Sequence, residues 1–385
     1  MFAPVITGVG IVSCAGVGMS AHGKAFATTR RATAATVADP FAQVRHPLYA
    51  LACDESRPLD LPASELARLA TDEALRDAEL CAELVDAGRV RVIMASSVAD
   101  ASSTETARTS GRKLPPSDFA LLDALRERED LTGRAGYELS NACAGSGYAI
   151  AIGCDLIASG KADVVIAGGA ESYSRVTIAA FNAMSALSKS GVSRPFDRNR
   201  DGVVLGEGAA VVILESAEHA RSRRAQAYAM VSGSGWSCDA YHPIAPDPSG
   251  TQITRAMREA IQRAGVTAPD IGCVIPHGTG TVHNDVIESR SLAAVFDGTA
   301  GAVPLYSLKA SIGHLAGGSA AASVAVAAVG LRDGRLPGNV PVEDLDPACT
   351  VAVPTRPISL GARSVMVNAY AAGCNNISLI LGPAA

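Results

Sequence analysis

Aromatic side chains make up only 4% of the 385 residues, and Trp236 is the single tryptophan. A surface that stacks the bases of single-stranded nucleic acid needs several aromatic rings, so this composition excludes such a role. Charged residues are also scarce at 18%, and a net charge of −5 argues against binding to DNA or RNA. Hydrophobic residues reach 48%, which excludes a disordered chain and predicts a large buried core.

The nine cysteines contain no Cys-x-x-Cys pair, and their number is odd. The sequence therefore predicts neither a metal site nor a disulfide framework, and free thiols are typical of the reducing cytoplasm. The first lysine is Lys24, so the charged start of a signal peptide is lacking. The apolar run from Leu315 to Leu331 is short for a membrane span and predicts a buried helix. We expect a cytoplasmic protein that binds neither membrane nor nucleic acid.

Short apolar runs alternate with helical patterns along the whole chain. This alternation predicts an α/β protein whose mixed sheets are covered by helices. The predicted strands are 4–12, 90–97, 137–142, 163–167, 209–215, 229–236, 271–276 and 303–307, with a closing hairpin of 365–370 and 377–381. The predicted helices are 64–84, 118–128, 145–159, 251–264, 285–296 and 313–331.

The order of strands and helices is similar in the first and second parts of the chain. We place a boundary in the charged segment 216–228, which gives an N-terminal half, 1–225, and a C-terminal half, 226–385. Because no low-complexity linker separates the halves, we expect them to share one interface.

The first candidate for chemistry is Cys143, which lies between a predicted short strand and a long helix that opens with small residues. The free N–H groups and the positive dipole end of that helix would stabilise a thiolate, and small neighbours would let a substrate carbonyl approach. The alternative is an inert cysteine, because free cysteine is among the most frequently buried residue types.

Two further motifs carry histidine. The segment His277-Gly278-Thr279-Gly280-Thr281 ends a predicted strand, where the sites of α/β proteins usually lie, although a turn with a capping histidine is an equal alternative. Lys309 and His314 lie just before the apolar helix, and a lysine and a histidine in such a setting need partners. Lys309 could form a structural ion pair with Glu288, or it could set the electrostatic field around His314.

A dinucleotide-binding oxidoreductase is the weakest alternative. Gly8-Val9-Gly10 begins the glycine pattern of that class, but Ser13 takes the place of the third glycine.

Taken together, these motifs resemble the β-ketoacyl-ACP synthases, or ketosynthases, of the thiolase superfamily. The resemblance is carried by Cys143, by the histidine motif at 277–281 and by Lys-Ala-Ser-Ile-Gly-His at 309–314. Similar segments at 5–13, 168–171, 194–202, 206–209 and 239–242 extend it over most of the chain. It implies the thiolase fold, a duplicated five-layer αβαβα sandwich that is usually dimeric.

The resemblance also implies a C–C bond-forming acyltransferase. Cys143 would carry an acyl group, and a malonyl unit would lose CO2 and attack it in a decarboxylative Claisen condensation. His277 and His314 would bind the malonyl thioester carbonyl, while Lys309 would organise His314 with Glu288 behind it.

Other residues gain roles from the same resemblance. The backbone N–H groups of Cys143 and Ala372 would form the oxyanion hole. Thr279 and Thr281 would contact the 4'-phosphopantetheine arm of an acyl carrier protein (ACP) or of CoA, with no bound cofactor. Expected partners are ACP and either a second copy of the chain or a chain-length-factor-like subunit. A purely non-catalytic subunit of that kind would lack Cys143. The basic surface that ACP needs could come from Arg68, Arg126 and Arg128, although the loose pattern there favours a merely solvated face.

The main departure from the family is the gate loop, Tyr370-Ala371-Ala372-Gly373-Cys374. Ala372 stands where family members carry an aromatic residue, so space opens above Cys143. Ala245 and Pro276 also depart from the family pattern. These changes favour a specialised type II polyketide or polyene pathway, or one like fatty-acid synthesis. The alternative is a ketosynthase-like acyltransferase or cyclising enzyme that uses the same cysteine without malonyl condensation.

Overall fold

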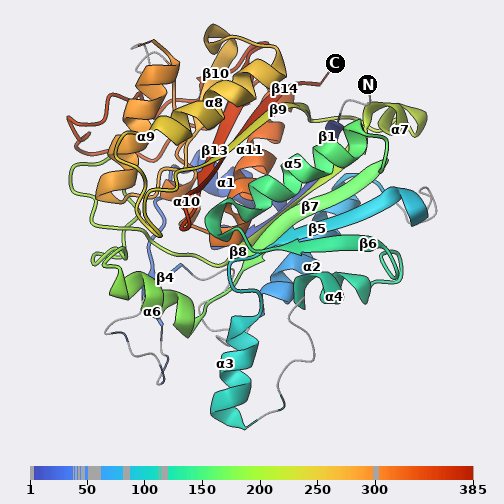
Figure 1. The fold of residues 1–385 in the computed structure, drawn as a ribbon, viewed down its shortest axis with the longest axis horizontal. Coiled ribbons are helices and arrows are strands. Elements are labelled where there is room, and N and C mark those ends of the chain that lie inside the picture. The colour runs from blue at the N-terminus through green and yellow to red at the C-terminus, as the bar shows by residue number, and fades with distance from the viewer. Residues whose placement is uncertain are drawn as a thin grey trace.

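The computed structural model describes residues 4–37, 39, 41, 44, 48–50, 62–80, 87–111, 113, 120–297 and 303–384. A ten-stranded mixed sheet runs through its centre (Figure 1). Its strands follow the order β10 (Ile271–Ile275), β13 (Ser364–Tyr370), β14 (Asn375–Pro383), β9 (Ala229–Cys238), β1 (Pro4–Ser13), β8 (Gly208–Ser216), β7 (Val164–Glu171), β5 (Val90–Ala95) and β6 (Ala135–Leu139), with β2 (Gly16–Val17) beside β1.

The sheet has two halves that meet at β1 and β9, where Val5 pairs with Met230 and Ile6 pairs with Ala229. The N-terminal sheet half runs from β1 to β6, and the C-terminal sheet half runs from β9 to β10. Each half contains both antiparallel and parallel strand pairs. The parallel pairs are β5 with β6 and β5 with β7 in the N-terminal half, and β10 with β13 in the C-terminal half. The predicted mixed sheets are therefore confirmed.

Helices complete a five-layer arrangement. Between the two sheet halves lie α5 (Gly145–Ala158) and α11 (Ser319–Arg332), which contact each other and strands of both halves. Outside the N-terminal half lie α2 (Ala63–Asp77) and α4 (Ala120–Arg126), and outside the C-terminal half lie α8 (Thr251–Ala264) and α9 (Val282–Val295) (Figure 1). Nearly all of α11 is buried, because its Ala, Ser, Gly and Val side chains are small enough to fit between two sheets. This is the predicted αβαβα sandwich of the thiolase fold.

In both halves, glycine residues of a central strand allow an outer helix to pack closely against that strand. A Cβ atom on Gly10 of β1 would lie 1.9 Å from the carbonyl oxygen of Ala70 in α2. A Cβ atom on Gly235 of β9 would lie 2.1 Å from the carbonyl oxygen of Ala256 in α8. Only glycine permits such an approach, so Gly8-Val9-Gly10 serves helix packing.

Most predicted elements are present with their ends shifted by a few residues, and α8 coincides with its predicted range. The predicted strand 303–307 is wrong: Pro304 and Leu305 form only isolated bridges, because the chain turns at once into α10 (Lys309–Ile312). The helix predicted from residue 313 begins at Ser319, after the short 3-10 helix η6 (Ala316–Gly318). The last residues of the predicted helix 64–84 and the first of 118–128 lie outside the described residues.

Several elements were not predicted. The helices among them are α1 (Gly18–Ala27), α3 (Ala101–Ser110), α6 (Arg175–Ala183) and α7 (Ala217–Ser222), with the 3-10 turns η2 (Ala87–Arg89) and η4 (Ala268–Asp270). Two small sheets pair β3 (Ala35–Thr36) with β4 (Leu48–Tyr49), and β11 (Arg335–Leu336) with β12 (Ile358–Ser359). Within the described ranges, no helix is long and apolar enough to cross a membrane.

Candidate active site

A pocket of about 480 Å³ brings together Cys143, His277 and His314, which come from three distant segments of the sequence. Thr279 and Thr281 line the same pocket, and their hydroxyl oxygens lie 3.0 Å apart. The wall is completed by residues of both halves: Phe181, Met184, Ser185, Ala186, Asp201, Gly202, Val203, Asp239, Ile244, Ala245, Pro246, Val282, His283, Asn284, Tyr370, Ala371, Ala372, Cys374 and Asn376.

A strained turn presents Cys143 at the start of α5. Ala142 has a φ of 43°, in the left-handed region that alanine rarely adopts, and it begins the short 3-10 helix η3 (Ala142–Ala144) that leads into α5. Cys143 is 6% exposed in this turn. The turn therefore aims the thiol into the pocket at the positive end of the helix.

The resting thiol holds its proton firmly. Burial raises the pKa of Cys143 to about 12, and the Glu171 carboxylate acts in the same direction. The Lys309 ammonium and the backbone N–H groups of Cys143 and Ala372 oppose this rise. The expected thiolate is thus not the resting state. The two N–H groups nevertheless lie near the sulfur, where an oxyanion hole would need them.

His277 is fixed through both its backbone and its ring. Its backbone N–H donates to Glu288 Oε1 at 2.8 Å, and the N–H of Gly278 donates to Glu288 Oε2 at 2.8 Å. The N–H of Tyr370 donates to Nδ1 of the His277 ring at 3.2 Å. Because burial, followed by Lys309 and His314, places the pKa of His277 well below 6.5, the ring is neutral at pH 7. Its single proton must therefore lie on Nε2.

His314 lies beside His277, with ring centroids 5.4 Å apart and planes at 89°. Its backbone is held between Val204, whose carbonyl accepts its N–H at 2.9 Å, and Gly206, whose N–H donates to its carbonyl at 3.0 Å. Nδ1 of the ring lies 2.8 Å from the hydroxyl oxygen of Ser319. Burial, followed by Lys309, sets the pKa of His314 well below 6.5, so this ring is neutral too.

Lys309 begins α10 and is 6% exposed. Burial lowers the pKa of its ammonium, and the charges of Glu288, Cys143 and Asp285 oppose that change. Both oxygens of Glu288 are committed to the backbone of 277–278, so among the described residues Glu288 acts on Lys309 through its charge rather than as a direct ion-pair partner. In place of the direct ion pair considered for Lys309, the same carboxylate thus gives a longer-range electrostatic interaction.

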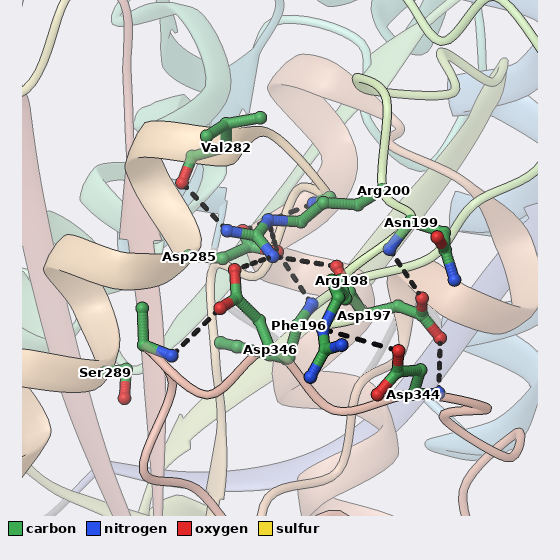
Figure 2. Close-up of polar contacts among 12 residues, drawn as sticks. Phe196, Asp197, Arg198, Asn199, Arg200, Val282, Asp285, Ser289, Asp344 and Asp346 are labelled. Atoms are coloured by element: carbon green, nitrogen blue, oxygen red, sulfur yellow. Dashed lines mark hydrogen bonds and ion pairs between the residues drawn. The ribbon is translucent and has the colours of Figure 1, made fainter.

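A buried arginine joins the pocket wall to the histidine motif at 277–281 (Figure 2). Arg200 donates to the carbonyls of Asp197, Thr281 and Val282 and to the carboxylate of Asp346. Its Nε lies 3.7 Å from Asp285, which also accepts the N–H groups of Phe196 and Gly280. This network fixes 194–202 against the loop that carries Thr279 and Thr281.

The gate loop is tied to the segment after β9. The N–H of Gly373 donates to the carbonyl of Pro243 at 2.7 Å, and the thiol of Cys374 donates to the carbonyl of His242 at 2.8 Å. Gly373 and Cys374 both have positive φ. Ala372 is exposed on this loop and lines the pocket, so its methyl group leaves the mouth open.

The candidate basic residues on α2, at the end of α4 and just after it form ion pairs with carboxylates of their own chain. Arg68 pairs with Glu65 and Asp72, Arg126 with Asp123, and Arg128 with Asp72 and Asp130. Because their charges are paired in this way, they support the alternative interpretation, a solvated surface rather than a docking site for ACP. In the described part of the chain, no group of three or more His, Cys, Asp or Glu residues is placed to hold a metal ion.

Four contributors had no assigned role before the structure. Glu171 accepts hydrogen bonds from Ser96, Ser97 and Gly317 behind the pocket. Asp285, Arg200 and Ser319 were also missed. The spacing of Asp285 and Glu288, three residues apart on one helix face, was an available signal for Asp285. The roles of Arg200 and Ser319 depend on contacts that no local pattern reveals.

Comparison with known proteins gives a family match in both halves of the chain. The family description "Beta-ketoacyl synthase, N-terminal domain" matches residues 24–220, and "Beta-ketoacyl synthase, C-terminal domain" matches residues 228–343. The 3-oxoacyl-[acyl-carrier-protein] synthase 2 of Rhizobium meliloti (strain 1021) is 40% identical over 256 residues, which cover 64% of this chain and 60% of that relative. The matched part thus spans less than two thirds of this curated relative.

Solved structures match over the full chain. The ishigamide ketosynthase/chain length factor superposes with a TM-score of 0.89 at 29% identity, and a beta-ketoacyl synthase from Burkholderia phymatum STM815 with a TM-score of 0.86 at 29% identity. Each comparison covers 100% of both chains. The fold is therefore the ketosynthase fold. This chain belongs to the beta-ketoacyl synthase family.

Proposed function

We propose that this protein is a β-ketoacyl-ACP synthase that extends a cysteine-bound acyl group with a malonyl unit. The observation that carries the proposal is the shared pocket of Cys143, His277 and His314, in which one thiol faces two neutral imidazoles. A neutral imidazole whose Nε2 bears the proton is a hydrogen-bond donor, which is the form needed to stabilise a developing enolate.

The first half-reaction loads the acyl group. The sulfur of Cys143 attacks the carbonyl of an acyl thioester, and the backbone N–H groups of Cys143 and Ala372 stabilise the tetrahedral oxyanion. The thiol of the carrier then leaves, and the acyl group remains on Cys143. The small residues at the start of α5 let the thioester carbonyl approach these two N–H groups closely.

The second half-reaction forms the C–C bond. The thioester carbonyl of the malonyl unit accepts hydrogen bonds from His277 and His314, so the charge that develops as CO2 leaves is held on the enolate oxygen. The enolate carbon attacks the acyl carbonyl on Cys143, and the bond between that carbon and the Cys143 sulfur breaks. The β-ketoacyl product stays on its carrier, and the Cys143 sulfur takes up a proton to restore the thiol. Lys309 contributes by keeping both rings neutral, because its positive charge opposes their protonation.

The substrates arrive on a phosphopantetheine arm. Thr279 and Thr281 present hydroxyls along the pocket, and Ile244 and Val282 add apolar rims that are 47% and 55% exposed. We assign the arm to this channel, with ACP as the carrier and CoA as the alternative. The small Ala372 at the mouth favours a long or rigid acyl chain, which supports a role in a type II polyketide or polyene pathway.

Assembly and location complete the proposal. We divide the chain at residues 225 and 226, with the nucleophile in the first half and both histidines in the second. A second copy, or a chain-length-factor-like subunit, is the proposed partner, since the ishigamide structure that this chain resembles is a ketosynthase/chain length factor. We place the enzyme in the cytoplasm, because free cysteines such as Cys154, Cys273 and Cys349 suit a reducing compartment.

The test is a reconstituted condensation. Purified protein is incubated with a panel of acyl-ACP and acyl-CoA donors and with malonyl-ACP, and products are identified by mass. The expected result is a β-ketoacyl product two carbons longer, with one CO2 released per turn. Acyl transfer or hydrolysis without malonyl consumption would instead identify a ketosynthase-like acyltransferase and overturn the proposal.

A further inference from the structure

The two histidines of the pocket have different hydrogen-bond partners at Nδ1. Nδ1 of His277 faces the backbone N–H of Tyr370, which can only donate. Nδ1 of His314 faces the hydroxyl of Ser319, which can donate or accept. A neutral His277 therefore has one possible tautomer, whereas the tautomer of His314 depends on the direction of one hydrogen bond.

Acyl loading needs a proton acceptor that His277 cannot provide. The thiol of Cys143 is protonated in the resting protein, so its proton must leave when sulfur bonds to carbon. Nε2 of His277 already carries a proton. Nε2 of His314 belongs to a ring that lines the same pocket, and it is free to accept a proton if Nδ1 holds the ring's own proton.

We propose, resting on the function proposed above, that Ser319 is a positioning residue which accepts a hydrogen bond from Nδ1–H of His314 and thereby makes Nε2 of His314 the base for acyl loading. During acyl loading His277 and His314 then occupy complementary tautomers, one donor and one acceptor, and reversal of the Ser319 hydrogen bond gives His314 the Nε2–H form that donates to the malonyl carbonyl. Ser319 is suited to hold this arrangement because it is 5% exposed and is fixed as the first residue of the buried helix α11. The helix is itself held by the hydroxyl of Ser146 on α5, which accepts the N–H of Ala321 at 3.1 Å.

The proton balance of loading is closed within the site. The S–H bond of Cys143 breaks as its sulfur bonds to the acyl carbon, and the proton passes to Nε2 of His314. The carbon–sulfur bond of the donor thioester breaks, and the departing carrier sulfur takes that proton as its thiol. The charged groups that act on His314 during this step are Lys309, which disfavours the imidazolium, and Cys143, whose developing thiolate favours it. The imidazolium is therefore short-lived and returns its proton to the leaving group.

The tautomer can be observed directly in the resting protein. Wild type labelled with ¹⁵N-histidine is examined by NMR for which ring nitrogen of each histidine is protonated, with His314→Asn and His277→Asn spectra used for assignment. We expect Nδ1–H for His314 and Nε2–H for His277. Finding Nε2–H for His314 in wild type would overturn the inference, whatever the enzyme's activity.

Kinetics supply the second test. We expect Ser319→Ala to convert His314 to the Nε2–H form and to slow acyl loading by about 10²-fold, the lower end of a general-base contribution. Release of CO2 from malonyl thioester should fall by less than about threefold, because the Nε2–H form of His314 is the one that donates to the malonyl carbonyl. Ser319→Thr keeps the hydroxyl and should recover most of the loading rate. Ser323→Ala removes another buried hydroxyl from α11 and should load like wild type.

The outcomes separate this inference from the proposed function. Unchanged loading by a folded Ser319→Ala variant would overturn the role of Ser319 while leaving the condensation reaction in place. A wild type that accepts no acyl thioester would remove the proposed function, and the NMR result would still decide the tautomer. Melting temperature and circular dichroism of each variant exclude misfolding as the cause of a slow rate.

Discussion

The two halves of the molecule bias their reactive groups in opposite electrostatic directions. In the N-terminal half, burial and the Glu171 carboxylate keep a proton on Cys143. In the C-terminal half, burial and the Lys309 ammonium keep protons off His277 and His314. The pocket between them thus holds a neutral thiol and two neutral imidazoles.

The contrast between a protonated thiol and two unprotonated imidazoles explains how a buried pocket can hold both a proton donor and a proton acceptor. An isolated charge in such a pocket would be costly, so each half stabilises the neutral form of its own reactive group. Charge then develops only during the reaction, next to groups placed to receive it. Substitutions in one half at a time should therefore change the reaction in different ways.

Removing the nucleophile should have the largest effect. Cys143→Ala is expected to lower acyl loading by more than about a thousandfold, because the other cysteine among the described lining residues, Cys374, lies on the gate loop with its thiol donating to the carbonyl of His242. Intact-protein mass after exposure to acyl thioesters measures the loading. Cys154→Ala, which removes a thiol further along α5, should load normally. Equal acylation of the Cys143→Ala variant would assign the nucleophile elsewhere.

Removing the donor of the C-terminal half should affect condensation more than loading. His277→Ala is expected to reduce CO2 release by about 10²–10³-fold, the usual cost of one donor to a developing oxyanion. Acyl loading should fall less than about tenfold, since His277 gives no base to that step. A variant that lost loading and condensation equally would show that the two histidines do not divide the work.

Neutralising Lys309 should shift the pH dependence. In wild type the ammonium lowers the pKa of both imidazoles, so they stay neutral as the pH falls below 7. Lys309→Met removes that charge, so both pKa values rise and the acidic limb of acyl loading, which needs His314 as a neutral base, moves to higher pH. A pH–rate profile measures the shift. The exposed Lys161→Met serves as the control, and an acidic limb that stays in place would refute the electrostatic role.

The smallest effect is expected on the N-terminal side. Glu171→Gln removes the carboxylate charge that raises the pKa of Cys143, so that pKa should fall and the thiolate fraction at a fixed pH should increase. The rate of alkylation by iodoacetamide reports that fraction. Glu218→Gln, at an exposed position, is the matched control. A slower alkylation of Glu171→Gln would reverse the sign of the proposed interaction.

The architecture could be predicted from the sequence because each helix or strand in a layer needs a regular spacing of apolar residues on its buried face. A helix such as α8 alternates buried Ile253, Ala256 and Ala260 with charged residues, and its predicted bounds are those observed. The strand predicted at 303–307 fails because its apolar residues are buried by bridges to two different segments, without the ladder of a full strand. The helix α3 escaped prediction because it buries little more than Ser102 and Ala107 and so carries no apolar periodicity.

The sequence predicted the separate motifs of the candidate site but not the contacts between them. The Cys143, His277 and His314 segments could be recognised locally, and the fold brings them together. What each group does depends on partners distant in sequence: Tyr370 lies 93 residues from His277, and Gly317 lies 146 residues from Glu171. Local pattern therefore pointed to a thiolate at a helix start, whereas burial keeps the proton on Cys143.

The matched glycines of β1 and β9 have a consequence beyond packing. Gly8 and Gly10 admit α2 in one half, and Gly233 and Gly235 admit α8 in the other, each pair spaced by one residue on a strand at the junction of the sheet. Duplication of a single ancestral half would produce the same spacing of glycines on the equivalent strand of each half. The scaffold then kept its shape in both copies, while the copies diverged into one that carries a nucleophile and one that carries imidazoles.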